Sequence, residues 1–328
     1  MIRLIQVGVG GFGWSWTDIV LNNKQVQLTA LVDINEEILN RALTERGLPK
    51  EMGFTNLAEA IEKKPADAVL LVTPPATHKE LANIALEAGL NVLCEKPLAD
   101  NMDDAKQMAE LAEKMGKILM VSQNYRFSRQ ARTAKRAVDE LEGLSYVQIS
   151  FHKAPHFGGF REKMPYPLLI DMSIHHFDLL RFLTSSNPQR VQAFSWRPKW
   201  SWFEGDPCLM MFIEMDRDIK AGYFGSWVSG GAETPWDGVW RLQGYETAIL
   251  WNEMGILRAK GEQIIPIEPL PMPIEGRDLV LETFREAVEK GEQPECNARD
   301  NLWSLAMVFS ALESIKSGKP VAIADYLR

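Results

Sequence analysis

The sequence predicts an α/β protein in which a doubly wound parallel sheet precedes an α+β domain with a large, mostly antiparallel sheet. In the first 123 residues, short apolar runs alternate with helical patterns. Apolar runs without polar alternation suit strands buried on both faces, and strands joined by helices form parallel sheets. After residue 123 several strand patterns follow one another directly, which favours antiparallel pairing. We therefore expect two domains, 1–123 and 124–328.

The predicted elements of the first domain are short strands with amphipathic helices between them. The expected strands are 4–7, 28–32, 68–72, 91–94 and 118–121, and the helices include 36–46, 78–88 and 103–115. The second domain should begin with a helix over 129–141 and a strand over 144–152, followed by a Gly/Pro-rich loop and a helix over 169–183. Its later strands are expected at 191–196, 208–215, 221–228, 239–244 and 248–252, and its last helices at 278–290 and 299–317.

Composition excludes several classes of protein. The chain has 328 residues, a hydrophobic fraction of 46% and a net charge of −8, which argues against general binding to nucleic acid or to anionic membranes. Its three cysteines form no C-x-x-C pair, and the first residues read as a strand rather than as a signal peptide. The sequence contains no HExxH motif and no cysteine cluster with the spacing of metal ligands, so no metal site is expected. These features predict a cytoplasmic protein.

A glycine-rich motif follows the first predicted strand. Gly8, Gly10 and Gly13 form G-x-G-x-x-G, with Gly11 and Phe12 between the last two glycines, and a helical pattern follows at once. In a dinucleotide-binding fold the first glycine permits a tight turn, the second lets the backbone approach the pyrophosphate and the third allows close helix packing. The alternative is an incidental glycine-rich turn. The order of strand, loop and helix favours a nicotinamide dinucleotide site.

Asp33 supports this interpretation, because it ends the second predicted strand 20 residues beyond Gly13. An acid at this place accepts hydrogen bonds from the adenosine ribose and would repel the 2′-phosphate of NADP. Ile34 and Asn35 follow it, so no arginine stands there to bind that phosphate. We therefore expect NAD, and keep NADP as the alternative.

Two further segments end predicted strands of the parallel sheet, where ligands of doubly wound folds bind. The residues expected to face the cofactor there are Thr73, Pro74 and His78 after the fourth strand, and Glu95 and Lys96 after the fifth. Pro97 restricts Lys96 to an extended conformation, from which its ammonium could project toward a substrate oxygen. A solvated lysine at a strand end explains the same pattern.

The helical pattern at 169–183 carries acid/base residues on an otherwise apolar segment. Asp171, His175 and Asp178 stand at i, i+4 and i+7, which places them on one face of an α-helix. A carboxylate that orients an imidazole is suited to proton transfer. A solvated polar face with a satisfied histidine is the other interpretation. Asp178 reads as a supporting residue or a helix hydrogen-bond partner.

Together these motifs resemble the Gfo/Idh/MocA family, the group of glucose–fructose oxidoreductase and inositol dehydrogenase. The resemblance rests on G-x-G-x-x-G, T-P-P-x-x-H, E-K-P and the segment 124–127, and it extends into the second half. It implies a dehydrogenase of sugars or polyols in which Lys96, Asp171 and His175 form a catalytic triad. It also implies a Lys96–Pro97 bond that is often cis, and a homodimer or homotetramer built through the second sheet.

The sequence departs from the family where the substrate binds. Many members have a glycine-rich entry to the catalytic helix and a glycine between the Asp and the His, whereas this chain has Ser173 and a proline-rich entry. The identity of the sugar or polyol is therefore open. Candidate substrate-binding residues are Tyr125 and Arg126 at the domain junction, and His152 and Arg161 before the helix. The last two also fit a solvated loop.

Two other functions compete with the dehydrogenase. An NAD-dependent glycosidase of the same family would oxidise its substrate only transiently and recycle the cofactor. A non-catalytic regulator that binds a dinucleotide would need none of Lys96, Asp171 and His175, so their joint presence counts against it.

Overall fold

The computed structural model describes residues 1–328, which form two compact units. The first unit comprises residues 1–124 and 274–302, and the second comprises residues 125–273 and 303–328. The first unit therefore includes a segment from the last quarter of the chain, in addition to the region that the sequence assigns to it. The boundary between residues 123 and 124 stays a prediction.

The first unit is built on a six-stranded parallel sheet with the strand order β3-β2-β1-β4-β5-β6. The strands are β1 (Ile2–Val7), β2 (Val26–Val32), β3 (Gly53–Phe54), β4 (Ala68–Leu71), β5 (Asn91–Cys94) and β6 (Leu119–Val121). The helices are α1 (Phe12–Asn22), α2 (Glu36–Glu45), α3 (Leu57–Lys63), α4 (His78–Glu87), α5 (Met102–Met115) and α9 (Gly276–Lys290). This strand order confirms the doubly wound fold, in which ligands bind beyond the carboxyl ends of the strands.

Local sequence signals explain where these helices begin and end. Asn35 caps α2 by accepting a hydrogen bond from the Ile38 amide, and Asn101 caps α5 in the same way. Gly116 ends α5 in a left-handed conformation, which glycine adopts without strain. All four residues of β4 are buried, as expected of a central strand with helices on both faces.

The second unit contains a nine-stranded sheet with the order β14-β13-β12-β11-β7-β10-β9-β8-β15. All its neighbouring strands pair antiparallel except β7 and β10, which run parallel. The strands are β7 (Tyr146–His152), β8 (Pro188–Trp196), β9 (Cys208–Met215), β10 (Lys220–Ser226), β11 (Val239–Gln243), β12 (Thr247–Asn252), β13 (Gly255–Lys260), β14 (Gln263–Pro266) and β15 (Val321–Ala322). Its helical elements are α6 (Arg129–Asp139), α7 (Gly159–Lys163), the π-helical turn η4 (Leu168–Met172), α8 (Ser173–Thr184) and α11 (Ala324–Leu327), and α10 (Ala298–Ser317) runs from the first unit into the second.

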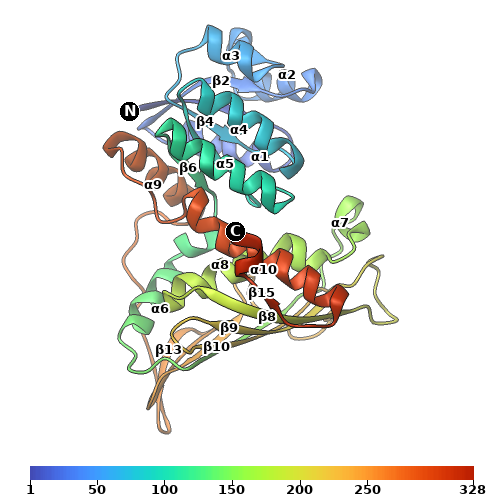
Figure 1. Cartoon of the computed structure of the whole chain (residues 1–328). Coiled ribbons are helices and arrows are strands. Elements are labelled where there is room, and N and C mark those ends of the chain that lie inside the picture. The colour runs from blue at the N-terminus through green and yellow to red at the C-terminus, as the bar shows by residue number, and fades with distance from the viewer. The chain divides into compact units, whose positions relative to one another are not determined.

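The two faces of this sheet differ. Helices α6 and α8 lie along one face (Figure 1), where Phe151 and Tyr223 pack against His176 of α8. On the other face Phe194, Met210 and Phe224 stand side by side on adjacent strands, with exposed fractions of 53%, 45% and 37%. The second sheet thus has one covered face and one exposed apolar face.

The expected antiparallel character of the second sheet is confirmed, but several elements differ from the sequence prediction. Strands β3, β13, β14 and β15 escaped it because they are very short or carry few buried residues. The helix expected over 169–183 is divided into η4 and α8. No helix of the structure combines the length and apolarity that a membrane span requires.

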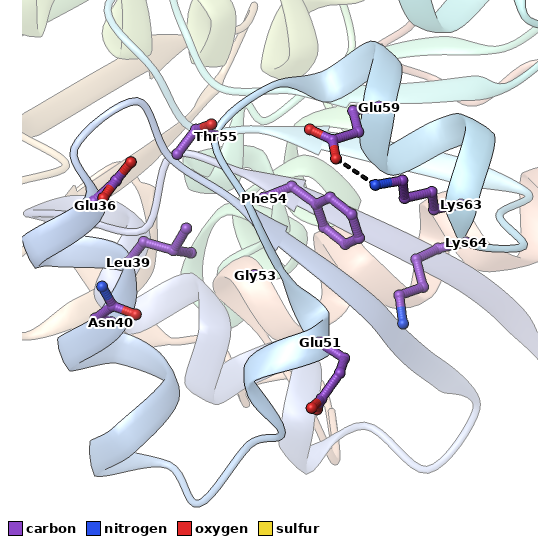
Figure 2. A pocket seen from close by; sticks show the side chains of 10 residues that line it. All are labelled: Glu36, Leu39, Asn40, Glu51, Gly53, Phe54, Thr55, Glu59, Lys63 and Lys64. Carbon is purple, nitrogen blue, oxygen red and sulfur yellow. Dashed lines mark hydrogen bonds and ion pairs between the residues drawn. The ribbon is translucent and has the colours of Figure 1, made fainter.

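A pocket of about 550 Å³ opens at the β3 edge of the parallel sheet (Figure 2). It lies between α2 and α3, and Phe54 forms part of its wall while the Phe54 carbonyl accepts a hydrogen bond from the Asp33 amide. A Lys63–Glu59 ion pair stands at its rim. The pocket therefore adjoins the loop after β2, although none of the predicted site residues lines it.

Candidate functional site

The glycine motif forms a close-packed turn between β1 and α1. A Cβ atom at Gly8 would lie 2.2 Å from the Val72 carbonyl oxygen, and one at Gly13 would lie 2.2 Å from the Gly8 carbonyl oxygen. Gly8 also has a φ of 85°, which favours glycine. The buried Gln6 amide donates hydrogen bonds to the Gly8 and Gly13 carbonyls at 3.0 and 2.8 Å and so holds the two ends of the turn together.

The helix that follows this turn fits a phosphate group. Gly11 is the N-cap of α1, gives no side-chain cap, and has open space where a side chain would stand. The first turn of α1, which begins at Phe12, carries no acidic residue. The positive end of the helix dipole is therefore open to an anion, and the residues present fit a dinucleotide pyrophosphate.

Asp33 lies just beyond the end of β2 and faces the glycine turn. Its carboxylate accepts hydrogen bonds from the amides of Val9 and Asn35, both at 2.9 Å. These bonds fix the carboxylate at the edge of the turn. In dinucleotide-binding folds a carboxylate at this place accepts hydrogen bonds from the ribose hydroxyls. Gly10, the remaining motif glycine, packs against the Ile38 side chain.

His78 is placed as a brace rather than as a surface ligand. Its fully buried ring contacts the Thr73 carbonyl through Nε2 at 2.8 Å, and the Pro97 and Leu98 carbonyls through Nδ1 at 3.1 and 3.2 Å. Burial lowers the pKa of this imidazole. His78 thus ties the loop after β4, which begins with Thr73 and Pro74, to the loop after β5.

Glu95 is likewise engaged within the first unit. The Trp16 indole donates to Glu95 Oε1 at 2.7 Å, and the Lys96 amide donates to Oε2 at 3.1 Å. Burial raises the pKa of the Glu95 carboxyl. The Lys96–Pro97 peptide bond is cis, as the family resemblance implied. Glu95 therefore anchors the backbone that presents Lys96, and its role as a direct cofactor ligand stays a prediction.

In the second unit, the predicted catalytic helix begins with a π turn. The Ser173 amide donates to the Leu168 carbonyl, five residues back, and regular α-helix starts only at Ser173. Because π turns rotate side chains relative to an α-helix, the i, i+4 spacing of Asp171 and His175 does not place them as on a continuous helix. The Arg161 Nε donates to Asp171 Oδ2 at 2.7 Å. Arg161, a candidate substrate ligand from its place in the sequence, is thus paired with Asp171, and its role toward substrate stays a prediction.

His175 lies in the first turn of α8, with only 6% of its surface exposed. The Tyr125 ring stacks on its imidazole, with ring centroids 4.3 Å apart and planes inclined by 14°. Burial raises the pKa of the Tyr125 hydroxyl well above its usual value, so this ring stays neutral at physiological pH. The structure thus brings Tyr125, which is expected to bind substrate, against His175, which is expected to transfer a proton.

Arg126 is directed away from solvent. Its Nε donates to Asp178 Oδ2 at 2.7 Å and its Nη2 donates to Oδ1 at 2.5 Å, and both side chains are almost fully buried. Ser304 adds a hydrogen bond to the same carboxylate at 3.3 Å. Arg126 therefore anchors α8 through Asp178, and its role as a substrate ligand stays a prediction.

His152 lies on the other face of the second sheet. It ends β7, where alternation directs Phe151 toward α8 and His152 toward the exposed face, and its ring packs against Phe224. Its Nδ1 is 3.5 Å from the Ser229 hydroxyl, and burial lowers the pKa of its imidazole. The structure does not bring His152 to the face that carries His175, so the site proposed below omits it.

The sequence did not single out Gln6 or Arg277. Gln6 braces the glycine turn, and a glutamine within the apolar run of residues 4–7 was the available signal for it. Arg277, at the start of α9, hydrogen-bonds to Ser15 of α1. Nothing in the sequence near Arg277 relates it to α1, because 262 positions separate it from Ser15.

The fold and the glycine-turn site of the first unit define a dinucleotide-binding domain, and comparison with known proteins shows which proteins the chain is similar to. The model of the Gfo/Idh/MocA "Oxidoreductase family, NAD-binding Rossmann fold" matches residues 2–123. The chain is 25% identical to 1,5-anhydro-D-fructose reductase of Ensifer adhaerens, covering 85% of this chain and 86% of that protein. It is 24% identical to scyllo-inositol 2-dehydrogenase (NAD(+)) of Bacillus subtilis, covering 98% and 96% of the two chains. Residues 2–123 are thus similar to the NAD-binding domain of Gfo/Idh/MocA oxidoreductases, and the chain as a whole is similar to a reductase and a dehydrogenase.

The architecture of both units is shared with known structures. An oxidoreductase from Agrobacterium radiobacter, crystallised with NAD+, L-tartaric acid and magnesium, superposes with a TM-score of 0.90 over 99% of both chains, at 18% identity. At this identity the likeness establishes the fold, and the chemistry of the site must be argued from the residues.

Proposed function

We propose that this protein is an NAD-dependent dehydrogenase that oxidises a hydroxyl-bearing carbon of a sugar, polyol or sugar derivative, or reduces the corresponding carbonyl. The observation that carries the proposal is His175, a buried imidazole held flat against Tyr125 at the start of α8. The two relatives of the protein named above are, by name, a reductase of an anhydrofructose and a dehydrogenase of an inositol, which supports a polyhydroxylated substrate.

In the proposed reaction His175 accepts the proton of the substrate hydroxyl, and the Lys96 ammonium donates a hydrogen bond to the same oxygen as negative charge develops on it. The bound NAD supplies the acceptor for the hydride that leaves the carbinol carbon. The hydrogen bond from the Lys96 amide to the Glu95 carboxylate fixes the backbone of Lys96. Reduction of a carbonyl uses the same groups in reverse.

Asp171 is proposed to orient the π turn η4, in which it lies and which directly precedes the helix turn of His175. Its carboxylate is held by Arg161, whose guanidinium also packs over the rings of Phe157 and Phe160 at 5.4 and 5.0 Å. The pair therefore links α7 to the π turn that precedes His175. Substitution of Asp171 should lower turnover more than cofactor binding, because the carboxylate acts on the geometry of the reacting groups.

The test is NADH formation, followed by its near-ultraviolet absorbance, with a panel of inositols, aldoses, sugar acids and aryl glycosides. Wild type, Lys96→Met, His175→Asn and the double variant are compared, with His152→Asn and Lys63→Met as matched controls. We expect each single site variant to lose at least about 100-fold in kcat while it still binds NAD. The double variant should lose far less than the product of the two losses, because both residues serve one step.

The competing functions give different outcomes in the same assay. Cleavage of aryl glycosides without net NADH would replace the dehydrogenase by a glycosidase. Tight NAD binding with no turnover of any compound, unchanged in the variants, would favour a regulator. Full activity of His175→Asn would remove the proposed proton acceptor.

The exposed apolar face of the second sheet is proposed to bury itself against a second copy of this chain. Phe194, Met210 and Phe224 form a continuous row across three strands, and Phe212 on β9 is 49% exposed beside it. Contiguous apolar surface of this kind favours association. Sedimentation velocity should show a dimer or tetramer for wild type and for Lys24→Glu, and a smaller species for Met210→Glu. A monomeric wild type would contradict the proposal.

A further inference from the structure

Arg277 lies against the helix that follows the glycine turn. It is the second residue of α9, and its Nη1 donates to the Ser15 hydroxyl at 2.7 Å. Its guanidinium carbon lies 4.5 Å from the centroid of the Phe12 ring and 5.4 Å from that of Trp16. Positions 12, 15 and 16 share one face of α1, so the guanidinium is held on that face from two sides.

The charge of Arg277 is not neutralised by an ion pair. Arg285, on the same helix, pairs with Glu282 and Glu289, whereas no carboxylate oxygen lies within 4 Å of the Arg277 guanidinium. Glu95 and Asp278 attract it only from a longer range, and burial lowers its pKa. Arg277 is thus a half-buried cation fixed by a hydroxyl and two aromatic rings, an arrangement suited to an anion.

The nearest helix terminus indicates which anion this is. Phe12 is the first residue of α1, and the pyrophosphate of a dinucleotide binds at that terminus in doubly wound folds. The neighbouring strands indicate which end of the cofactor lies near Arg277. Asp33, the predicted ligand of the adenosine ribose, directly follows β2. Trp16, which lies under the Arg277 guanidinium, is bonded to Glu95 directly after β5, and β1 lies between β2 and β5 in the sheet.

We propose that Arg277 binds the cofactor pyrophosphate, at the phosphate that carries the nicotinamide ribose. The planar guanidinium matches two phosphate oxygens, and Ser15, Phe12 and Trp16 orient it before the cofactor arrives. The proposal rests on the proposed function only in that a dinucleotide must bind. It gives the last quarter of the chain a direct part in cofactor affinity.

The experiment measures calorimetric binding of ADP-ribose, NAD and AMP to wild type, Arg277→Met and Arg277→Lys, with Arg285→Met as the matched control. Methionine keeps apolar contact with the two rings but removes the charge. Arg277→Met should bind ADP-ribose and NAD on the order of 10–100-fold more weakly, the range for loss of a charged hydrogen bond. AMP affinity should change less than about twofold, because AMP lacks the second phosphate. Arg277→Lys should fall between wild type and methionine.

Three results would overturn the inference. Unchanged binding of ADP-ribose by Arg277→Met would show that the guanidinium does not contact the pyrophosphate. An equal loss for AMP and ADP-ribose would place the effect in the packing of α1. A loss for ADP-ribose in Arg285→Met as large as in Arg277→Met would show a general charge effect. Failure of the wild type to bind any of these nucleotides would instead contradict the proposed function itself.

Discussion

Tyr125 and His175 stack face to face, with ring centroids 4.3 Å apart, although 50 positions separate them in the chain. The next residue, Arg126, is bonded through two nitrogens to Asp178, which stands one turn after His175 on α8. Tyr125 and Arg126, which are adjacent in the chain, therefore both contact α8, the first through a stacked ring and the second through an ion pair. The stacked ring limits rotation of the imidazole, and the ion pair fixes where that ring lies.

Replacement of Tyr125 by leucine should lower kcat about 3–10-fold, which corresponds to the ~0.5–1.5 kcal/mol of an aromatic pair. Phenylalanine should retain at least half of the wild-type rate, because the ring and not the hydroxyl makes the contact. NAD affinity, measured directly, should be the same in all three proteins. Equal loss in the leucine and phenylalanine variants would instead assign the effect to the hydroxyl.

The Arg126–Asp178 pair is predicted to be a stability determinant. Both partners are almost fully buried, so Asp178→Leu takes two charged hydrogen bonds away from a desolvated guanidinium and should lower the free energy of unfolding by about 3–5 kcal/mol. Arg126→Met combined with Asp178→Leu should recover part of this loss, because neither charge is then left buried. Denaturant unfolding of the four proteins measures this. A double variant less stable than both single variants would contradict it.

The sequence predicted those parts of the site that depend on local signals. The glycine turn, Asp33 and the segment around Lys96 each follow a strand directly, so their place at the sheet edge follows from the topology. Asp178 was also expected to support the helix. The role of Arg126 was not predicted, because an arginine next to an expected substrate residue gives no sign of its partner 52 positions away.

Other features depend on tertiary context that no local pattern contains. The π turn at Leu168–Met172 reads as ordinary helix, since its residues have the same apolar spacing. His152 was grouped with the site because it is near it in the sequence. Side chains alternate between the two faces of a strand, however, and this alternation places His152 on the face opposite α8. Helix α9 was predicted as a helix, but its membership in the first unit depends on contacts with α1 and β1.

His176 should make the stability of the protein depend on pH. Its Nε2 donates to the Trp236 carbonyl at 3.0 Å and its Nδ1 accepts from the Tyr223 hydroxyl at 3.0 Å, an arrangement that requires a neutral ring. Burial lowers its pKa from 6.5 to about 4. The unfolded chain therefore binds a proton more readily. The contribution of His176 is fully present above pH ~6.5 and is lost progressively as pH falls toward 4, by up to about 3 kcal/mol.

His176→Gln tests this, because glutamine can donate to the Trp236 carbonyl and accept from Tyr223 without titrating. The free energy of unfolding of wild type should fall relative to that of the variant between pH 6.5 and 4, and the difference should be constant above pH ~7. A difference that does not change with pH would show that His176 does not titrate in this range.

Asp33 and Ile34 should together set the preference for NAD over NADP. The Asp33 carboxylate is fixed by the Val9 and Asn35 amides, so it would repel a 2′-phosphate, and Ile34 follows it with 92% of its surface exposed. Asp33→Ser combined with Ile34→Arg removes the repulsion and adds a guanidinium at the exposed position. We expect the ratio of kcat/KM for NAD to that for NADP to fall by at least about 100-fold, since close like-charge contacts cost several kcal/mol. Ile34→Arg alone should change the ratio less, because Asp33 then still faces the phosphate and pairs with the new arginine. A ratio unchanged in the double variant would place cofactor discrimination elsewhere, with the Lys63 and Lys64 side of the neighbouring pocket as the next region to alter.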